Sequence, residues 1–297
     1  MKLYIVPPLQ NPNLIGRIME AISKRTDVVA ATIIDNKIIE ATENPSAKRS
    51  LNEHLISFAG TSNAVFRVFQ VLERMTKLVV EALKWTGSAL VGVYESLASK
   101  FLVAWTSTSV LRLPDVTTKA IKSMNDLNAA EKDVPTDFAR KAVKAVHDTT
   151  EAAAMWLYSA SFFLSNSAWK TAGDVPDLIS NATDLQMNAE DWHLASQVAK
   201  KAVAQNSPTE VERAIVHTQR SSFIKMLKAA CSVASGVLGL AALAFGAPLL
   251  PAVALIVISL SSTIFAITSH FYQETAPYKM IDFFQNRTIQ VAPAVVV

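Results

Sequence analysis

A carboxylate and an imidazole lie two residues apart in the segment Asp191-Trp192-His193. Groups of these two types transfer protons in enzyme catalysis. On a helix, however, residues two positions apart do not face each other, so this spacing does not predict a catalytic pair. The histidines of the chain are scattered: His54, His147, His193, His217 and His270.

Other motifs of enzyme chemistry are missing from the sequence. It has neither a Gly-rich phosphate loop nor a Gly-x-Ser-x-Gly elbow. No spacing of Cys and His residues supports a zinc site. The single cysteine, Cys231, lies in an apolar stretch, where we expect an unreactive thiol. We therefore predict a non-enzymatic protein with no catalytic residue, no metal ligand and no cofactor.

The residues that determine the architecture are apolar. Between Ala229 and Gln273 the chain contains no Asp, Glu, Lys or Arg. Two prolines in the middle, at Gly246–Pro251, break a helix and divide the stretch into the lobes Ala229–Gly246 and Ala252–Ser269. With about 1.5 Å of rise per residue, each lobe is roughly 27 Å long, close to a hydrocarbon core of about 30 Å. We predict a membrane-inserted helical hairpin, the alternative being a hairpin buried in a soluble helical domain.

Composition and charge narrow the class of protein further. The chain has 297 residues, of which 51% are hydrophobic and only 18% charged. A net charge of +3 is too small to indicate a nucleic-acid partner. We expect no cleavable signal peptide, because the apolar run Leu3–Val6 is short and is followed by two prolines. Basic residues flank both ends of the hairpin but not its turn, so we expect both termini on the cytosolic side of the membrane.

Residues 61–84 repeat apolar side chains at three- and four-residue steps, which predicts a long amphipathic helix over Asn63–Lys84. Its polar face is mostly basic, and such a face can lie against anionic lipid or an acidic protein. The alternative is a solvated face without a partner. The candidate partner or lipid surface consists of Arg67, Gln70, Arg74, Lys77 and Lys84.

The middle of the chain suggests a duplicated two-helix unit. Phe101 and Trp105 match Phe163 and Trp169, and Pro114-Asp115 matches Pro176-Asp177, at a spacing near 62 residues. Each Pro-Asp pair suits the first turn of a helix. The two units of this hypothesis cover residues 86–147 and 148–208.

Both ends of the chain contain β-branched runs. Val28–Ile34 and Lys37–Ala41 flank a turn at Asp35-Asn36 and predict a hairpin. Lys2–Val6 and Thr288–Val291 are further strand candidates. We thus expect a mostly α protein, a helical bundle with a membrane hairpin and a minor β element near the termini. Its parts are an N-terminal segment (1–60), a helical region (61–228), the hairpin (229–269) and a tail (270–297).

Two equal apolar lobes around a short turn, Ala229–Gly246 and Ala252–Ser269, resemble the bilobed segment of chlamydial inclusion-membrane proteins. That resemblance implies a secreted virulence effector of a vacuole membrane whose soluble parts recruit host proteins. This sequence departs from the family's pattern because its long soluble part precedes the hairpin. The pairing of Asn63–Lys84 with the late apolar stretch is also similar to peroxisome-elongating peroxins.

We therefore predict a membrane-inserted helical protein that presents a soluble helical surface to partners. The expected partners are a lipid bilayer and another protein. Two alternatives stay open: a soluble helical-bundle interaction module with a buried apolar hairpin, and a membrane-elongation protein.

Overall fold

The computed structural model describes residues 42–129, 135–204, 209–246, 250–281 and 283. Over these residues the chain forms seven α-helices, one 3-10 helix and no strand, which confirms a mostly α protein. The elements are η1 (Pro45–Lys48), α2 (Leu51–Ala59), α3 (Ser62–Trp85), α4 (Val91–Asn128), α5 (Pro135–Leu164), α6 (Ser167–Ala204), α7 (Thr209–Phe245) and α8 (Ala252–Thr275).

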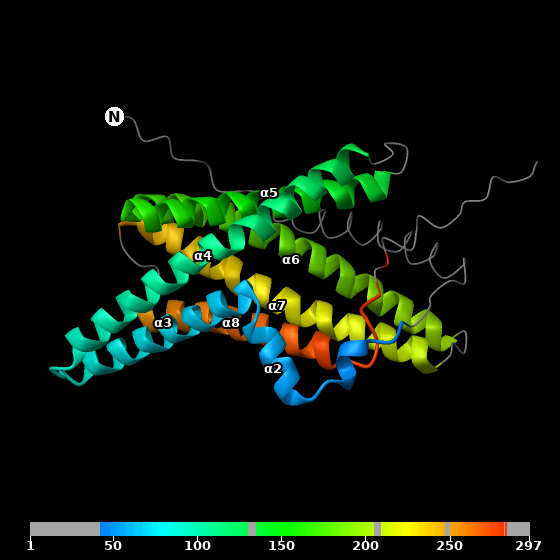
Figure 1. The fold of residues 1–297 in the computed structure, drawn as a ribbon, viewed down its shortest axis with the longest axis horizontal. Helices are drawn as coiled ribbons and strands as arrows, with labels where there is room; N and C mark the ends of the chain where they lie inside the picture. The colour runs from blue at the N-terminus through cyan, green and yellow to red at the C-terminus, as the bar shows by residue number, and fades with distance from the viewer. Residues whose placement is uncertain (1–41, 130–134, 205–208, 247–249, 282, 284–297) are drawn as a thin grey trace, which may run out of the picture.

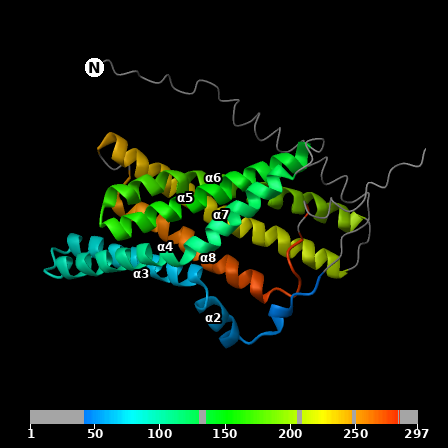
Figure 2. The ribbon, with the colours of Figure 1, turned by 45° about the horizontal axis from the view of Figure 1, so that its top comes forward.

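Six helices form a closed ring. Each of α3 to α8 packs against its neighbour in the chain, and α8 returns to pack against α3. The helices are grouped in three antiparallel pairs, α3–α4, α5–α6 and α7–α8, and Figures 1 and 2 show that all three pairs turn at the same end of the molecule. The opposite end holds the beginning of α5 and α7 and the end of α4, α6 and α8. This arrangement leaves room for a cavity along the ring axis.

One helix of each pair is very long. Helices α4 and α6 have 38 residues each, and α7 has 37. With about 1.5 Å of rise per residue, 38 residues extend roughly 57 Å, about twice the hydrocarbon thickness of a membrane. Pro114 and Pro176 lie inside α4 and α6, so the prediction that they start helices was wrong. Packing on both sides of each proline compensates for the one hydrogen bond that it removes.

The hairpin α7–α8 has the predicted form. Helix α7 ends at Gly246, whose φ of 68° is the left-handed conformation that commonly terminates a helix. Helix α8 begins directly after Pro251. The predicted boundary between residues 228 and 229 lies inside α7, which runs without interruption from the charged segment into the apolar lobe.

The structure does not show the duplicated unit. Phe101 and Trp105 belong to one helix, α4, whereas Phe163 and Trp169 are separated by the turn between α5 and α6 at Ser165. Trp105 is buried with 7% of its surface exposed, while 41% of Trp169 is exposed. The matching residues therefore occupy different environments, because the chain turns at different points in the two segments.

The two ends of the described chain lie side by side. Glu43 and Tyr278 form an isolated antiparallel bridge. The side-chain amide of Asn44 donates hydrogen bonds of 2.9 Å to the carbonyl oxygens of Gln273 and Ala276. The four predicted strand segments, Lys2–Val6, Val28–Ile34, Lys37–Ala41 and Thr288–Val291, lie outside the described residues.

Candidate functional site

Few residues of the hairpin α7–α8 are fully buried in the protein. Within the described residues, α7 and α8 are the two helices that are individually long and apolar enough to cross a membrane. Only 6% of the apolar stretch of α7 and 17% of that of α8 are buried within the protein. Large apolar side chains on the outside are Val237, Leu243, Phe245, Val257 and Ile264. The rest of the protein therefore covers these apolar side chains only in part.

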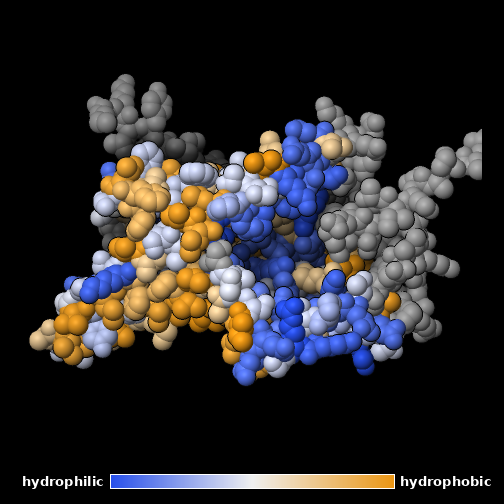
Figure 3. Space-filling model, viewed as in Figure 1, coloured by the Kyte–Doolittle hydropathy of each residue, from blue (hydrophilic) through white to orange (hydrophobic). Residues whose placement is uncertain are grey.

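The face of the molecule in Figure 3 also has an apolar end and a hydrophilic end. Figure 3 shows apolar side chains gathered toward the end where the helical pairs turn, and hydrophilic side chains over the opposite end. The apolar end includes Trp85, Phe163 and Leu164, which are 79%, 67% and 60% exposed. Exposed apolar patches of this kind mark contact with a membrane or with another protein.

The inner face of the hairpin is different, because it carries small and polar residues. Ser232 of α7 and Ser262 of α8 join the two helices through a hydroxyl–hydroxyl contact of 2.5 Å. A Cβ atom at Gly236 would lie 3.1 Å from the side chain of Leu178, so glycine allows α6 to approach α7 closely. The residues of this inner face line the central cavity: Ser232, Ser235, Gly236, Gly239, Ser259 and Ser262.

The central cavity has a volume of about 330 Å³ and is lined by all six helices of the ring. Part of its wall is aromatic. The indole of Trp105 contacts Phe66 and Tyr158 edge-on, with ring centroids 5.4 Å and 5.6 Å apart. The guanidinium of Arg112 lies over the Phe66 ring at 4.9 Å. Aromatic faces of this kind stabilise cations that are removed from water.

Three ion pairs lie in the cavity wall. Arg112 contacts Glu151 at 2.7 Å, Lys228 contacts Asp184 at 2.8 Å, and Lys170 contacts Asp174 at 3.5 Å. These pairs join α4 to α5 and α7 to α6, and the third lies within α6. Burial disfavours the ionised form of Asp184, but Lys228, His147 and the amide of Asn188 together outweigh it, so the pKa of Asp184 lies below its ordinary value.

Three further charged groups in the wall stand outside these pairs. They are Arg67 and Arg74 of α3 and Asp177 of α6. Arg67 Nη1 donates to the Gln70 amide oxygen at 3.1 Å, and Arg74 Nη1 donates to the carbonyl oxygen of Ser259 at 2.7 Å. Each arginine therefore donates one hydrogen bond to an uncharged acceptor.

The pKa values of these groups reflect their burial. Burial lowers the pKa of Arg67 to about 10, and the positive charges of Arg112 and Arg74 act in the same direction. Arg67 nevertheless stays protonated at neutral pH. Burial raises the pKa of Asp177 above its ordinary value, against the opposing effect of Arg67. Neither group has the close partner that would make its charge favourable.

A second cavity of about 630 Å³ adjoins the first toward the hydrophilic end. The two cavities share His147, Glu151 and Asp184 in their walls. The second cavity is lined by charged residues of α4 to α7, among them Arg140, Lys144 and Lys225. The charged side chains thus follow a path from the hydrophilic end of the bundle to the hairpin.

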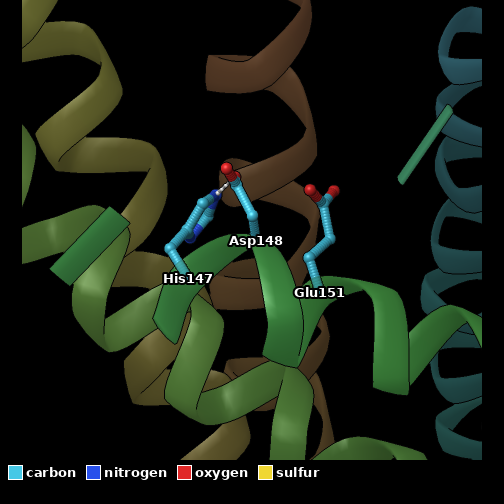
Figure 4. Close-up of side chains that lie close together, drawn as sticks. All are labelled: His147, Asp148 and Glu151. Atoms are coloured by element: carbon cyan, nitrogen blue, oxygen red, sulfur yellow. Dashed lines mark ion pairs between the residues drawn. The ribbon is translucent and has the colours of Figure 1, made fainter. Parts of the chain in front are cut away.

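His147, Asp148 and Glu151 form a group whose ligand-type atoms all lie within 4.8 Å of one another. Figure 4 shows the imidazole and the Asp148 carboxylate turned toward each other, with Glu151 beside them on α5. Asp148 is already bonded to Lys144 and Ser123, and Glu151 to Arg112. A metal ion would have to displace these cations, so the group has the contacts of an ion-pair network.

The predicted amphipathic helix is confirmed as α3, but its polar face lies differently from the expectation. Gln70 is 7% exposed, and Arg67 and Arg74 line the cavity. Lys77 is paired with Glu73, and Lys84 with Glu81 and Glu95. The outer face instead carries apolar residues that are between 38% and 53% exposed: Val68, Leu72, Met75 and Val79. No continuous basic stripe is therefore open to a partner along this helix.

The carboxylate of the sequence pair Asp191 and His193 contacts an arginine of α5. Asp191 forms a two-pronged ion pair with Arg140, with both oxygen–nitrogen distances at 2.8 Å. The residues that sequence reasoning missed are those of the cavity wall, Arg112, Glu151, Asp177 and Asp184. No local pattern distinguishes them in the sequence, because the helical segments around them contain other polar and charged residues.

No family model, no curated protein and no solved structure matches this chain. No residue role can therefore be transferred from a relative. Function has to be argued from the hairpin, the cavity and the divided surface alone.

Proposed function

We propose that this is a non-enzymatic membrane protein whose α7–α8 hairpin lies in the bilayer. The observation that carries the proposal is the incomplete burial of the hairpin, since few residues of its two apolar stretches are fully buried in the protein. In water this surface would have to be covered by another protein or would drive aggregation. A bilayer covers it without any further partner. The membrane-spanning segments are Ala229–Phe245 and α8.

The hydrophilic end of the bundle is the part that faces water and protein partners. Helices α4, α6 and α7 are about twice as long as a membrane requires, so they carry a charged surface beyond it. Both ends of the described chain lie at this end, consistent with the two termini on the cytosolic side. The finer proposal, that the protein is a secreted effector of a vacuole membrane, is supported by the bilobed form of the hairpin.

Membrane insertion is tested by adding charge to the outer face of the hairpin. Val257→Arg and Ile264→Arg replace residues that are 45% and 49% exposed on α8. Each should cost about 3 kcal/mol of insertion, as arginine does near the centre of a membrane helix. The double variant should be released from membranes by a carbonate wash that leaves the natural protein bound.

Ile121→Arg is the matched control, because Ile121 is 59% exposed at the hydrophilic end of α4. It should leave membrane retention unchanged. If carbonate removes the natural protein from membranes, the hairpin is not inserted and the proposal is wrong.

A further inference from the structure

We propose that the central cavity binds a small oxyanion of the phosphate or sulfate class, held by Arg67, Arg74 and the indole N–H of Trp105. This site is separate from the membrane role proposed above and does not require it. It follows from the charges, the hydrogen-bond donors and the shape of the cavity.

The cavity has an excess of positive charge after its ion pairs are formed. Three cations are neutralised by three carboxylates in the pairs of Arg112, Lys170 and Lys228. Two guanidiniums, of Arg67 and Arg74, then face one carboxylate, of Asp177. A buried charge without a partner is costly, so an excess of one cation in a cavity favours an anionic occupant.

The unsatisfied groups of the wall are donors. Among the described residues, Arg67 Nε and Trp105 Nε1 are buried nitrogen atoms without a hydrogen-bond partner. Trp105 is 7% exposed and lines the cavity. An indole N–H and a guanidinium N–H can only donate, so the missing partner is an acceptor. An oxyanion offers several acceptor oxygens and matches the fork of an arginine.

The remaining walls also suit such a ligand. The hairpin contributes hydroxyl groups of Ser235 and Ser259 and the open position of Gly239. A cavity of about 330 Å³ holds a tetrahedral oxyanion together with several waters, since one water occupies about 30 Å³ in the liquid. Nothing lies within 4 Å of a Cβ atom built at Gly239, so space is available there.

Access favours an oxyanion that comes from water rather than a lipid head group. The second cavity adjoins the first through His147, Glu151 and Asp184 and lies toward the hydrophilic end. A cation in that second cavity, Lys225, has its ammonium 3.7 Å from the sulfur of Met280. The second cavity thus connects the first with the hydrophilic end, from which a soluble anion enters.

The test is a titration of the purified full-length protein in uncharged detergent with inorganic phosphate, followed by calorimetry and by tryptophan fluorescence. We expect saturable binding. Arg67→Gln and Arg74→Gln should each weaken it about 10-fold or more, because each removes a hydrogen bond from a charged donor. Arg213→Gln is the matched control, since Arg213 is exposed on α7 and lines neither cavity.

Two further variants separate binding from folding. Asp177→Asn removes the one unpaired carboxylate and should strengthen phosphate binding, a change that damage to the fold would not produce. Gly239→Leu keeps every charge but fills the cavity and should abolish binding. Circular dichroism and gel filtration show whether each variant has kept its fold.

Three results would overturn the inference: no saturable phosphate binding, equal affinity in the arginine variants and the control, or no gain from Asp177→Asn. A lipid source is examined with vesicles of phosphatidylcholine with and without phosphatidylglycerol. Arginine-dependent binding to phosphatidylglycerol without binding to inorganic phosphate would refute the soluble oxyanion.

Discussion

The two ends of the central cavity differ in whether a buried aspartate has an ion-pair partner. Asp184 and Asp177 lie two turns apart on the same helix, α6. Asp184 contacts Lys228 at 2.8 Å and has a lowered pKa, whereas burial raises the pKa of Asp177, which stands outside the ion pairs. The comparison shows that an aspartate in the interior is structural when its partner is part of the protein. Where the partner is missing, burial makes the ionised carboxylate unfavourable.

The largest expected difference between the two ends comes from their arginines. Arg112→Met leaves Glu151 buried without its partner and should lower the free energy of unfolding by about 3–5 kcal/mol. Arg67→Met removes a cation that has no ion pair and should change it by about 1 kcal/mol or less. Denaturant unfolding in detergent measures both. Equal losses in the two variants would mean that the ends do not differ.

A smaller effect is expected at Lys228. Lys228→Met strands the carboxylate of Asp184 and should destabilise the protein by about 2 kcal/mol, less than Arg112→Met, because the side chain of Lys228 is 21% exposed and that of Arg112 is 8% exposed. Lys119→Met is the control, since its pair with Asp115 is more than half exposed and should contribute under about 0.5 kcal/mol. A loss at Lys119 as large as at Lys228 would contradict this ranking.

The two aspartates should also respond to pH with opposite signs. The lowered pKa of Asp184 adds stability above its unfolded value of about 3.9, and this stability is lost as the pH falls through that region. The raised pKa of Asp177 instead removes stability as the pH rises through its folded pKa.

At neutral pH, Asp177→Asn should therefore stabilise the protein by up to about 1 kcal/mol, while Asp184→Asn should destabilise it. Thermal unfolding between about pH 2 and pH 8 tests the pair, since the effect of Asp184 is lost below its unfolded pKa of about 3.9. The same sign in both variants would show that the two carboxylates do not differ in their surroundings.

The smallest effect concerns the hydroxyl contact inside the hairpin. Ser262→Ala breaks the 2.5 Å contact with Ser232 and should cost about 0.6 kcal/mol, the usual size of such a contact in membrane proteins. Helix association within detergent micelles, measured by unfolding in a denaturing detergent, can resolve it. A cost above about 2 kcal/mol would mean that Ser262 also stabilises the cavity wall through contacts other than the one with Ser232.

Sequence alone predicted the helical class, the hairpin and the limits of α3 closely, because these depend on local periodicity and on charge-free runs. It placed the polar face of α3 on the wrong side. In a soluble bundle a helix turns its apolar face inward, so Arg67 and Gln70 were expected to face outward. In this bundle Val68 and Leu72 lie outside instead, because the interior is already occupied by charged groups from four other helices.

The cavity could not be predicted for a different reason. Its ion pairs join residues far apart in the chain, as Arg112 and Glu151 or Asp184 and Lys228 do. These residues come into contact only when the ring of helices has closed. Pro114 and Pro176 lie inside helices for a similar reason that local sequence does not show. A proline that starts a helix and one inside a long packed helix have the same local sequence.

The short uncharged turn between α7 and α8 has a consequence for biogenesis. With both flanks on one side, the segment that must be carried across the bilayer during insertion is Gly246–Pro251 and its apolar neighbours, which contain no charged side chain. Transfer of such a loop avoids the desolvation cost that charged residues impose. The turn of the hairpin therefore presents no charged side chain that would oppose its passage through the bilayer.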